Sequence, residues 1–216
     1  MFIVFEGIEG CGKTTQIRLL GEFLESRQLA CTMTREPGGT PVGEEVRKIF
    51  LHSDNRALTP LTELLLVTAA RAQHVHQVIQ PALAAGRVVV CDRFFDATFA
   101  YQGYAGSLPL DMVRQSHELF LSGITPDVTL LLDCPVAEGL QRSRSRNRAE
   151  GKEVAEGRFE DMDLEFHEQV RQGYLERARQ EPERFALIDA LQDVASVQDR
   201  ICQVVSERLR EKGYAV

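Results

Sequence analysis

The sequence predicts a three-layer α/β fold in which helices cover both faces of a parallel sheet, and three observations carry this prediction. Five short apolar runs recur along the 216 residues, segments with a helical apolar period separate them, and a glycine-rich loop follows the first run. Strands of continuous apolar character are typical of a parallel sheet that is buried on both faces. Strands that alternate with helices are typical of an α/β fold.

The apolar runs give the predicted strands, which lie at residues 2–5, 30–34, 88–91, 128–132 and 185–188. The composition, 44% hydrophobic and 26% charged, is that of an ordinary globular protein. Neither a repeat nor a low-complexity linker divides the chain. We therefore expect a single domain over residues 1–216.

The predicted helices are indicated by apolar residues that recur at every third or fourth position. The sets that share a face are Ile17, Leu20 and Leu24; Val42, Val46, Ile49 and Phe50; Phe166, Val170 and Tyr174; and Val197, Ile201, Val204, Val205 and Leu209. One more helix is expected to begin at Thr59 and Pro60, a cap followed by a first-turn proline, and to end at Gly86.

The segment from about 141 to 161 has an unusual composition. It carries six basic residues and almost no apolar ones. We expect it to begin as the end of a helix and to continue as a mobile flap, or lid.

The charge balance excludes some classes of partner. The formal net charge is -7 at pH 7, whereas a nucleic-acid-binding surface normally shows as a basic excess. We therefore expect no nucleic-acid partner, and an anionic ligand must meet a local basic cluster. No stretch has the length of a membrane span, and the five cysteines form no CxxC pair. The expectation is a cytoplasmic protein that binds no membrane.

The glycine-rich loop fits a nucleotide triphosphate site. Gly7, Gly12, Lys13 and Thr14 match G-x-x-x-x-G-K-[ST] between a predicted strand and a predicted helix, the context that the motif requires. Lys13 is expected to reach the β- and γ-phosphates and Thr14 to offer its hydroxyl to Mg²⁺. The predicted ATP-binding residues are Gly7, Ile8, Glu9, Gly10, Cys11, Gly12, Lys13 and Thr14.

A second metal ligand is expected at the end of a strand. Asp92 ends "VVVCD" and Asp133 ends "VTLLLD", so either acid can hold magnesium at this edge of the sheet. We favour Asp92, because Arg93 follows it and supplies a phosphate-binding cation beside the metal.

Other nucleotide and metal motifs are missing from the sequence. The loop contains no G-x-G-x-x-G, so a dinucleotide fold is not indicated, and no Asn-Lys-x-Asp guanine motif is present. His167 and Glu168 begin like a zinc-protease helix, but position 171 is Arg. The five histidines are interpreted as ordinary surface or core residues.

Several segments together resemble the thymidylate kinase family, whose members phosphorylate dTMP with ATP in dTTP biosynthesis. The segments are "FEGIEGCGKTT", "TREPGGTPVGEEVR", "AARAQHV", "CDRFFDATFAYQG", "PDVTLLLD" and the arginine-rich segment with "GRFED" after it. The resemblance covers nearly the whole chain. It implies a P-loop nucleoside-monophosphate-kinase fold with a five-stranded parallel sheet, Mg²⁺ with ATP, and a homodimer.

The resemblance also implies the contacts of the acceptor. Arg35 and Arg93 would hold the phosphate of dTMP, for which two guanidinium groups suit a dianion better than lysines. In the base site, Arg71 would point at thymine and Thr98 would hydrogen-bond it. Tyr101 would occupy the place of a ribose 2′-hydroxyl, and Gln102 is a further candidate. Without the resemblance, Tyr101 would be interpreted as a core aromatic residue.

The sequence departs from the family pattern near the base. Val67 stands where the family usually has a phenylalanine that stacks on thymine, Ala97 where a serine is common and Ala70 where an aspartate is common. Loss of ring stacking removes roughly 0.5–1.5 kcal/mol of interaction energy beyond what the buried area contributes. We therefore expect weaker base selectivity, or another side chain over the ring.

The catalytic arginine is expected in the lid. Some thymidylate kinases place an arginine inside the phosphate loop and others, typically bacterial, place it in the lid; here the loop interior "IEGC" has none. Arg142 and Arg146 are spaced i, i+4, as are Arg144 and Arg148. Arg146 is the first choice for the catalytic cation, with Arg142 second, beside Lys13 and Arg93. The alternative is a solvated basic helix end.

Glu9 needs an explanation of its own, because a carboxylate about 4 Å from a phosphate charge is repelled by roughly 4 kcal/mol at an effective dielectric near 20. We expect Glu9 to face the acceptor, where the resemblance puts it near the sugar 3′-hydroxyl, rather than ATP. The alternative is a solvent-facing loop acid.

Two other functions of the protein stay open: a kinase for another nucleoside or nucleotide, and a P-loop ATPase that acts as a conformational switch.

Overall fold

A computed structural model describes residues 1–55, 57–120, 123–151 and 153–215 of the chain. Its centre is a five-stranded sheet with the strand order β2-β3-β1-β4-β5, and all pairs of neighbouring strands are parallel. The strands are β1 (Phe2–Glu6), β2 (Cys31–Arg35), β3 (Val88–Asp92), β4 (Val128–Asp133) and β5 (Phe185–Asp189). The five apolar runs therefore predicted the strands to within one residue at each end.

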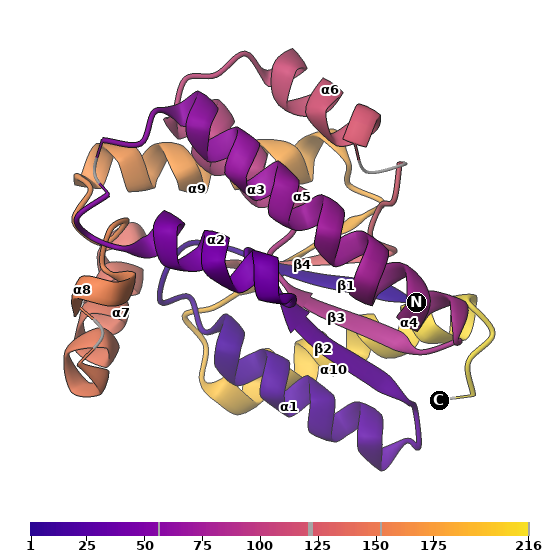
Figure 1. The fold of residues 1–216 in the computed structure, drawn as a ribbon. Coiled ribbons are helices and arrows are strands. Elements are labelled where there is room, and N and C mark those ends of the chain that lie inside the picture. Colours follow the sequence, from indigo (N-terminus) through magenta and orange to yellow (C-terminus); the bar gives the residue numbers. More distant parts are fainter. Residues whose placement is uncertain (56, 121–122, 152, 216) are drawn as a thin grey trace.

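The carboxyl ends of the strands meet at one edge of the sheet, which positions the site. Phe5 of β1 pairs in register with Asp92 of β3, and Asp92 pairs with Arg35 of β2. The arrowheads in Figure 1 point toward the side of the molecule where α7 and α8 lie. The residues that follow each strand are thus neighbours in space although they are far apart in sequence.

Helices cover the two faces of the sheet, which makes three layers (Figure 1). On one face lie α1 (Lys13–Ser26) and α10 (Val194–Glu211), whose Leu20, Leu24 and Ile201 pack against Ile3 and Phe5. The other face carries α5 (Phe95–Thr98), α6 (Leu110–Phe120) and α9 (Leu164–Gln180), together with a helical run that consists of α3 (Pro60–His74), the π-helical segment η1 (Val75–Ile79) and α4 (Gln80–Ala84).

The helix predicted between Thr59 and Gly86 is present, with its cap as expected. The Thr59 hydroxyl accepts from the backbone N–H of Thr62, and Gly86 has a positive φ of 73° after the end of α4. The π-helical segment η1 in its middle was not predicted. A second such segment, η2 (Phe99–Ala105), follows α5 and carries Tyr101 and Gln102 of the predicted base site.

Two details of α2 (Pro41–Leu51) correct the predicted apolar face. Val46 and Phe50 are buried, but Val42 and Ile49 are exposed. The reason is that α2 contacts the rest of the protein through a narrow stripe, so residues at the borders of the face stay in solvent.

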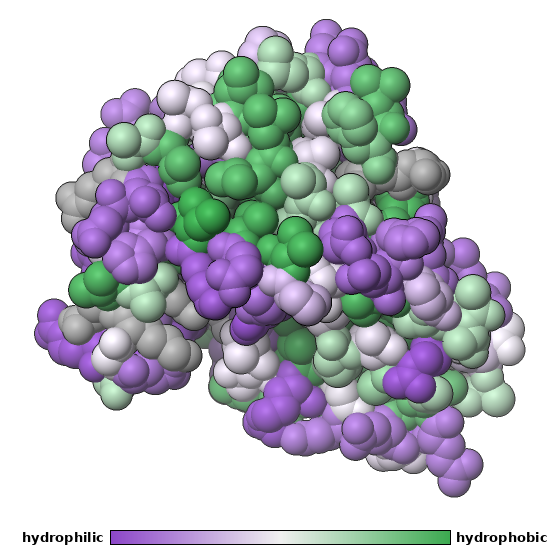
Figure 2. All heavy atoms as spheres, viewed as in Figure 1, coloured by the Kyte–Doolittle hydropathy of each residue, from purple (hydrophilic) through white to green (hydrophobic). Residues whose placement is uncertain are grey.

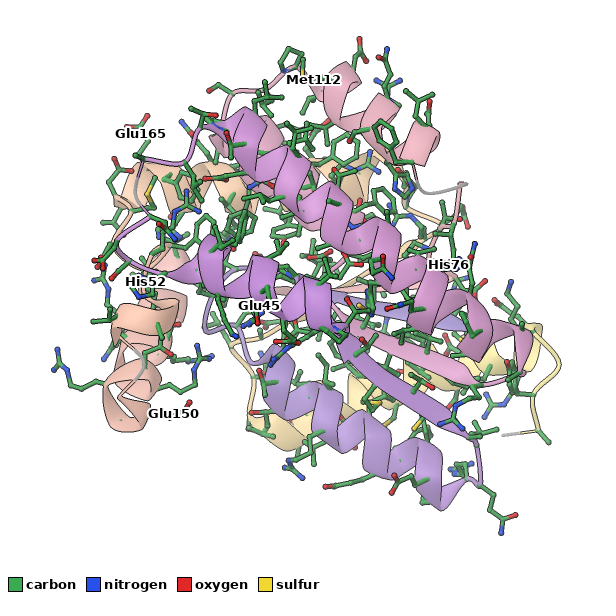
Figure 3. All side chains as sticks on the ribbon, in the orientation of Figure 1. Glu45, His52, His76, Met112, Glu150 and Glu165 are labelled. Carbon is green, nitrogen blue, oxygen red and sulfur yellow. The ribbon has the colours of Figure 1, made fainter. Side chains whose placement is uncertain are left out.

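The predicted lid is more helical than expected. Helix α7 runs through Val136–Glu150 and α8 through Glu153–Glu156, with Gly151 in a left-handed conformation between them; residue 152 of the predicted lid lies outside the described residues. The backbone N–H of Ser53 donates to the carbonyl of Val154 at 2.9 Å. Figure 3 labels His52 beside α8, where the loop after α2 meets the lid.

The surface carries exposed apolar side chains on two neighbouring helices. They are Leu61 and Leu65 of α3 and Met112, Leu119 and Phe120 of α6. Figure 2 shows hydrophobic side chains gathered over α3. Within the described part of the chain, none of the helices is long and apolar enough to cross a membrane.

Candidate active site

The phosphate loop joins β1 to α1 and relies on glycine backbone conformations. Gly7, Gly10 and Gly12 have positive φ angles of 136°, 71° and 99°, which side chains rarely allow. Lys13 is buried, and its Nζ donates to the carbonyl oxygens of Gly7 and Ile8, both at 2.9 Å. The lysine is thus folded back onto the loop, and backbone N–H groups of a loop of this kind can bind phosphate.

The loop also touches the base of the lid. A Cβ added at Gly10 would collide with the carbonyl oxygen of Gly139 in α7, and a Cβ at Gly139 would lie 2.5 Å from the carbonyl oxygen of Glu9. Glycine is therefore required on both sides of this contact. Any ligand in the phosphate loop lies next to the first turns of α7.

A single cavity of about 1290 Å³ connects the predicted donor and acceptor sites. The loop residues Glu9–Ile17 form one wall, and Arg71, Thr98 and Tyr101 form another. Arg142 and Arg146 of α7 line it from the lid side, and Arg35 and Arg93 from the ends of two strands. Of the favoured site residues, only Gly7 and Ile8 do not line this cavity. The alternative candidates Asp133, Arg144 and Arg148 do not line it either.

Glu9 does not point to solvent, because its side chain is only 16% exposed. One carboxylate oxygen, Oε1, accepts from Arg93 Nη2 at 3.1 Å and from the Tyr101 hydroxyl at 2.5 Å. The other, Oε2, is buried and lies 3.7 Å from His167 Nδ1. The alternative of a solvent-facing loop acid was therefore wrong.

The charges around Glu9 set its protonation state. Burial alone would raise the pKa of the Glu9 carboxyl, but Arg93, His167 and Lys13 hold this pKa well below its usual range. Because its pKa is lowered, the Glu9 carboxyl is ionised throughout the neutral range. It therefore presents a permanent hydrogen-bond acceptor beside Arg93 and Tyr101.

Arg93 is held by contacts with three residues, Glu9, Tyr101 and Tyr174. It follows β3 in a left-handed conformation with a φ of 67°, and its guanidinium lies 5.0 Å from the centre of the Tyr101 ring. Nη1 donates to the Tyr174 hydroxyl at 2.8 Å, and this hydroxyl donates to Glu6 Oε2 at 2.8 Å. A charge that is oriented in this way is suited to bind a phosphate at a defined place.

Glu6 supports the turn that carries Arg93. Its Oε1 accepts from the backbone N–H groups of Phe94 at 2.8 Å and Ala97 at 3.2 Å. Burial raises the pKa of the Glu6 carboxyl to about 7, against the lowering effect of Arg93. The carboxyl is fully buried and acts on the site through the groups that it orients.

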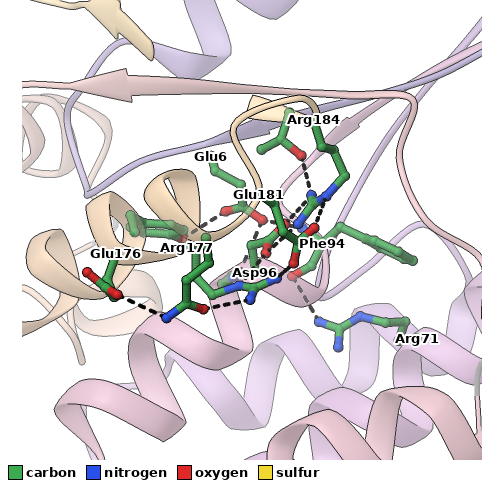
Figure 4. A network of polar contacts seen from close by, with 12 residues as sticks. Glu6, Arg71, Phe94, Asp96, Glu176, Arg177, Glu181 and Arg184 are labelled. Atoms are coloured by element: carbon green, nitrogen blue, oxygen red, sulfur yellow. Dashed lines mark hydrogen bonds and ion pairs between the residues drawn. The ribbon is translucent and has the colours of Figure 1, made fainter. Parts of the chain in front are cut away.

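A buried polar network lies beneath this turn (Figure 4). Asp96 is fully buried and binds two arginines: its Oδ2 accepts from Arg184 Nη1 at 2.6 Å, and its Oδ1 accepts from Arg177 Nε at 3.1 Å. Removing one partner of a buried ion pair leaves an uncompensated charge. The network therefore ties α5 to α9 and to the start of β5, and fixes the floor of the site.

Arg71 is positioned for a ligand by a second set of contacts. It is 4% exposed, and its Nε donates to Glu36 Oε2 at 2.5 Å. Its Nη2 donates to the Thr98 hydroxyl at 3.0 Å and to the Phe94 carbonyl at 3.1 Å. His74 Nδ1 lies 2.9 Å from the other oxygen of Glu36. Arg71 therefore cannot swing away from the cavity without breaking a buried network.

Val67 has no aromatic ring, but other residues of the same cavity wall do. Val67 is buried and lines the cavity together with Phe50, Phe159 and Tyr101. The ring centres of Phe50 and Phe159 are 5.3 Å apart, and those of Tyr101 and Phe159 are 5.2 Å apart. Rings from α2, η2 and the lid thus form an apolar part of the cavity wall.

Arg35 lies at the end of β2 and is the more exposed of the two predicted phosphate-binding arginines. Its side chain is 50% exposed, and Nη2 contacts Glu44 Oε2 at 2.9 Å. An exposed pair of this kind contributes little to stability. The guanidinium of Arg35 can therefore bind a dianionic ligand if it gives up only its weak ion pair with Glu44.

The two candidate metal ligands differ in their surroundings. Both oxygens of Asp133 accept from Arg171, at 2.7 and 2.9 Å. Asp92 has a buried oxygen, Oδ1, with no hydrogen-bond partner among the described residues, and Thr14 is exposed at the start of α1. Over the same residues, no group of three or more acidic, histidine or cysteine side chains could hold a metal by itself. This donor set fits Mg²⁺, which is usually held by one or two carboxylates plus substrate phosphates.

The four arginines of α7 lie on two faces of this helix. Arg142 and Arg146 line the main cavity, whereas Arg144 and Arg148 line a separate pocket with Leu140. Arg146 Nη2 donates to Ser143 Oγ at 3.0 Å, and Arg142 Nη1 donates to the Ala190 carbonyl at 3.3 Å. The i, i+4 spacing thus separates a cavity-facing pair from an outward pair.

Several residues that support the site were not identified from the sequence. Tyr174 was interpreted as part of an apolar helix face, but its hydroxyl joins Arg93 to Glu6. His167 was interpreted as an ordinary residue, yet it lies beside Glu9. A tyrosine within an otherwise apolar stripe was the one available signal, because a buried hydroxyl needs a partner.

Comparisons with known proteins agree with one another. The family model described as "Thymidylate kinase" matches residues 5–201. A thymidylate kinase of Syntrophotalea carbinolica is 54% identical over 212 residues, which cover 98% of each chain. A thymidylate kinase of Geotalea uraniireducens is 51% identical over 211 residues, or 97% of this chain and 98% of that one. The crystal structure of thymidylate kinase from Ehrlichia chaffeensis superposes with a TM-score of 0.76 at 33% identity, covering 95% of this chain and 98% of that one.

Proposed function

The chain belongs to the thymidylate kinase family, and from this premise we propose how its side chains divide the reaction between them. The protein is an ATP-dependent nucleoside-monophosphate kinase of nucleotide biosynthesis that phosphorylates dTMP to dTDP. The family activity needs one site for a triphosphate donor and another for a monophosphate acceptor, close enough for direct transfer.

ATP occupies the loop side of the cavity. The backbone N–H groups of residues 7–14 bind the phosphates, and Lys13 leaves the carbonyl oxygens of Gly7 and Ile8 to reach the β- and γ-groups. Thr14 and Asp92 would hold magnesium, and this assignment is supported by Asp92 Oδ1, which has no hydrogen-bond partner among the described residues. When bound, the ion neutralises charge on the phosphates.

dTMP occupies the opposite side. Arg93 and Arg35 bind its phosphate, and Glu9 accepts a hydrogen bond from the sugar 3′-hydroxyl. Tyr101 lies below Arg93 at the place of a ribose 2′-hydroxyl, and Arg71, Thr98 and Gln102 contact the base. The aromatic cluster of Phe50, Phe159 and Tyr101 covers the ring in place of the missing stacking residue at Val67.

The reaction is a direct transfer between these two sites. An oxygen of the dTMP phosphate forms a bond to the γ-phosphorus, the bond from that phosphorus to the β–γ bridging oxygen breaks, and ADP leaves. Arg146, with Arg142 second, stabilises the charge on the transferring group from the lid, while Lys13 and Arg93 hold its two ends. Closure of the lid at residues 141–161 excludes water and limits hydrolysis of ATP.

The assembly and location of the protein are part of the same proposal. The chain is one kinase domain with a lid, and it works as a cytoplasmic homodimer without nucleic-acid or membrane partners. The exposed apolar side chains of α3 and α6, Leu61, Leu65, Met112, Leu119 and Phe120, support a surface between two copies.

The observation that carries the proposal is the pairing of Glu9 with Arg93 in the cavity that Lys13 also lines. A panel of dTMP, dUMP, dCMP, dGMP and thymidine with ATP tests it. We expect kcat/KM for dTMP to exceed that for dCMP, dGMP and thymidine by about a hundredfold or more. Activity on thymidine but not on dTMP would show a nucleoside kinase, and ATP hydrolysis that ignores every acceptor would show an ATPase switch.

A further inference from the structure

Gln102 is held by a buried ion pair that connects the base site to the lid. Gln102 is 2% exposed, lines the cavity from η2, and its Nε2 donates to Glu63 Oε2 at 2.7 Å. The other oxygen of Glu63, Oε1, accepts from Arg158 of the lid segment. Glu63 lies in the first turn of α3, so three separate segments meet at this carboxylate.

Arg158 is itself fixed in one position. It is 6% exposed, Nη1 donates to the Phe50 carbonyl at 3.0 Å, and its guanidinium lies 4.9 Å from the centre of the Phe159 ring. The same guanidinium lies 5.6 Å from the centre of the Phe50 ring. Arg158 carries a permanent positive charge, and its Nη2 donates directly to Glu63 Oε1.

An ionised carboxylate can only accept hydrogen bonds, whereas an amide has one donating and one accepting end. Glu63 therefore dictates which end of the Gln102 amide faces it: the NH₂ group. The carbonyl oxygen Oε1 is left for the cavity. In a buried site a polar group that is aimed in this way discriminates strongly between a ligand donor and a ligand acceptor.

We propose that Glu63, with Arg158 behind it, is a specificity-determining positioning residue that orients the Gln102 carbonyl oxygen toward the base and so selects a pyrimidine with a ring N–H donor. Thymine and uracil carry that N–H at N3. Cytosine has an acceptor at N3, and two acceptors would face each other. The inference rests on the proposed function, because it needs the base of the acceptor to lie beside Gln102.

The test compares kcat/KM for dTMP, dUMP and dCMP in Glu63→Gln and Glu63→Asp. Glutamine has nearly the same shape but can donate or accept, so the Gln102 amide is free to turn; we expect the dTMP:dCMP ratio to fall about tenfold and the dTMP:dUMP ratio to stay within about twofold. Aspartate can still only accept, so the dTMP:dCMP ratio should stay near that of the unmodified enzyme even if the melting temperature falls. Glu45→Gln, on the exposed surface of α2 (Figure 3), is the control.

Two outcomes would overturn the inference. One is an unchanged dTMP:dCMP ratio in Glu63→Gln; the other is an equal fall in Glu63→Gln and Glu63→Asp, as a merely structural role would give. If Glu63→Gln does not fold, Gln102→Leu is measured instead. The inference requires this variant to lower the dTMP:dCMP ratio of kcat/KM. If the unmodified enzyme does not phosphorylate dTMP, the proposed function fails instead, so the two failures are distinguishable.

Discussion

Replacing Arg93 by lysine should lower kcat/KM for dTMP by about a hundredfold to a thousandfold. The guanidinium uses one nitrogen for Tyr174 and another for Glu9, and it lies against the face of Tyr101. A lysine has a single ammonium group, which cannot make these contacts and bind a phosphate in a fixed geometry. Steady-state kinetics at saturating ATP measures the loss.

Thymidine provides an internal control for this variant, because it has the base and sugar of dTMP but no phosphate. The affinity of thymidine, measured as a competitive inhibitor, should change by less than about threefold in Arg93→Lys. Arg114→Lys, which changes an exposed ion pair on α6, should leave all constants unchanged. An equal loss for dTMP and thymidine would assign Arg93 to the structure of the pocket and not to the phosphate.

Replacing Arg146 by alanine should lower kcat by about a thousandfold, the scale of an arginine that stabilises a transferring phosphoryl group. Arg144→Ala is the matched control, because Arg144 lies on the same helix but lines a different pocket. It should lower kcat by no more than about threefold. Rapid-quench measurement of a single turnover would separate the chemical step from product release.

Three results would distinguish the possible roles of the lid arginines. A large loss in Arg142→Ala with a small one in Arg146→Ala would move the catalytic role by one turn of α7. Small and equal losses in all four single variants would contradict the lid-arginine proposal. A large loss in Arg144→Ala would show that α7 turns its other face to the substrate.

The strands and the phosphate loop could be predicted because their signals are local. An apolar run such as Val88–Cys91 shows a buried strand by itself, and Gly7, Gly12 and Lys13 are only six positions apart. The choice between Asp92 and Asp133 could not be made on firm ground from the sequence, because it depends on Arg171, a distant partner that occupies Asp133. The exposed positions of α2 were mispredicted for a similar reason: periodicity gives the face of a helix but not the width of its contact.

The surroundings of Glu9 show the same limit more clearly. Its partners, Arg93, Tyr101 and His167, lie 84, 92 and 158 positions further along the chain. No spacing rule connects residues that meet only through the order of strands in the sheet. Charge repulsion could predict that Glu9 avoids the triphosphate, but only the fold shows which side chains hold it.

In the proposed reaction the phosphate loop has two faces, with Lys13 on the donor side and Glu9 on the acceptor side. Calorimetric titration of ATP and dTMP, each alone, into Lys13→Met and Glu9→Gln tests this division most directly. We predict that Lys13→Met weakens ATP binding by about tenfold or more and leaves dTMP binding within about twofold, while Glu9→Gln does the reverse. Loss of the same ligand in both variants, or an unchanged dTMP affinity in Glu9→Gln, would contradict it.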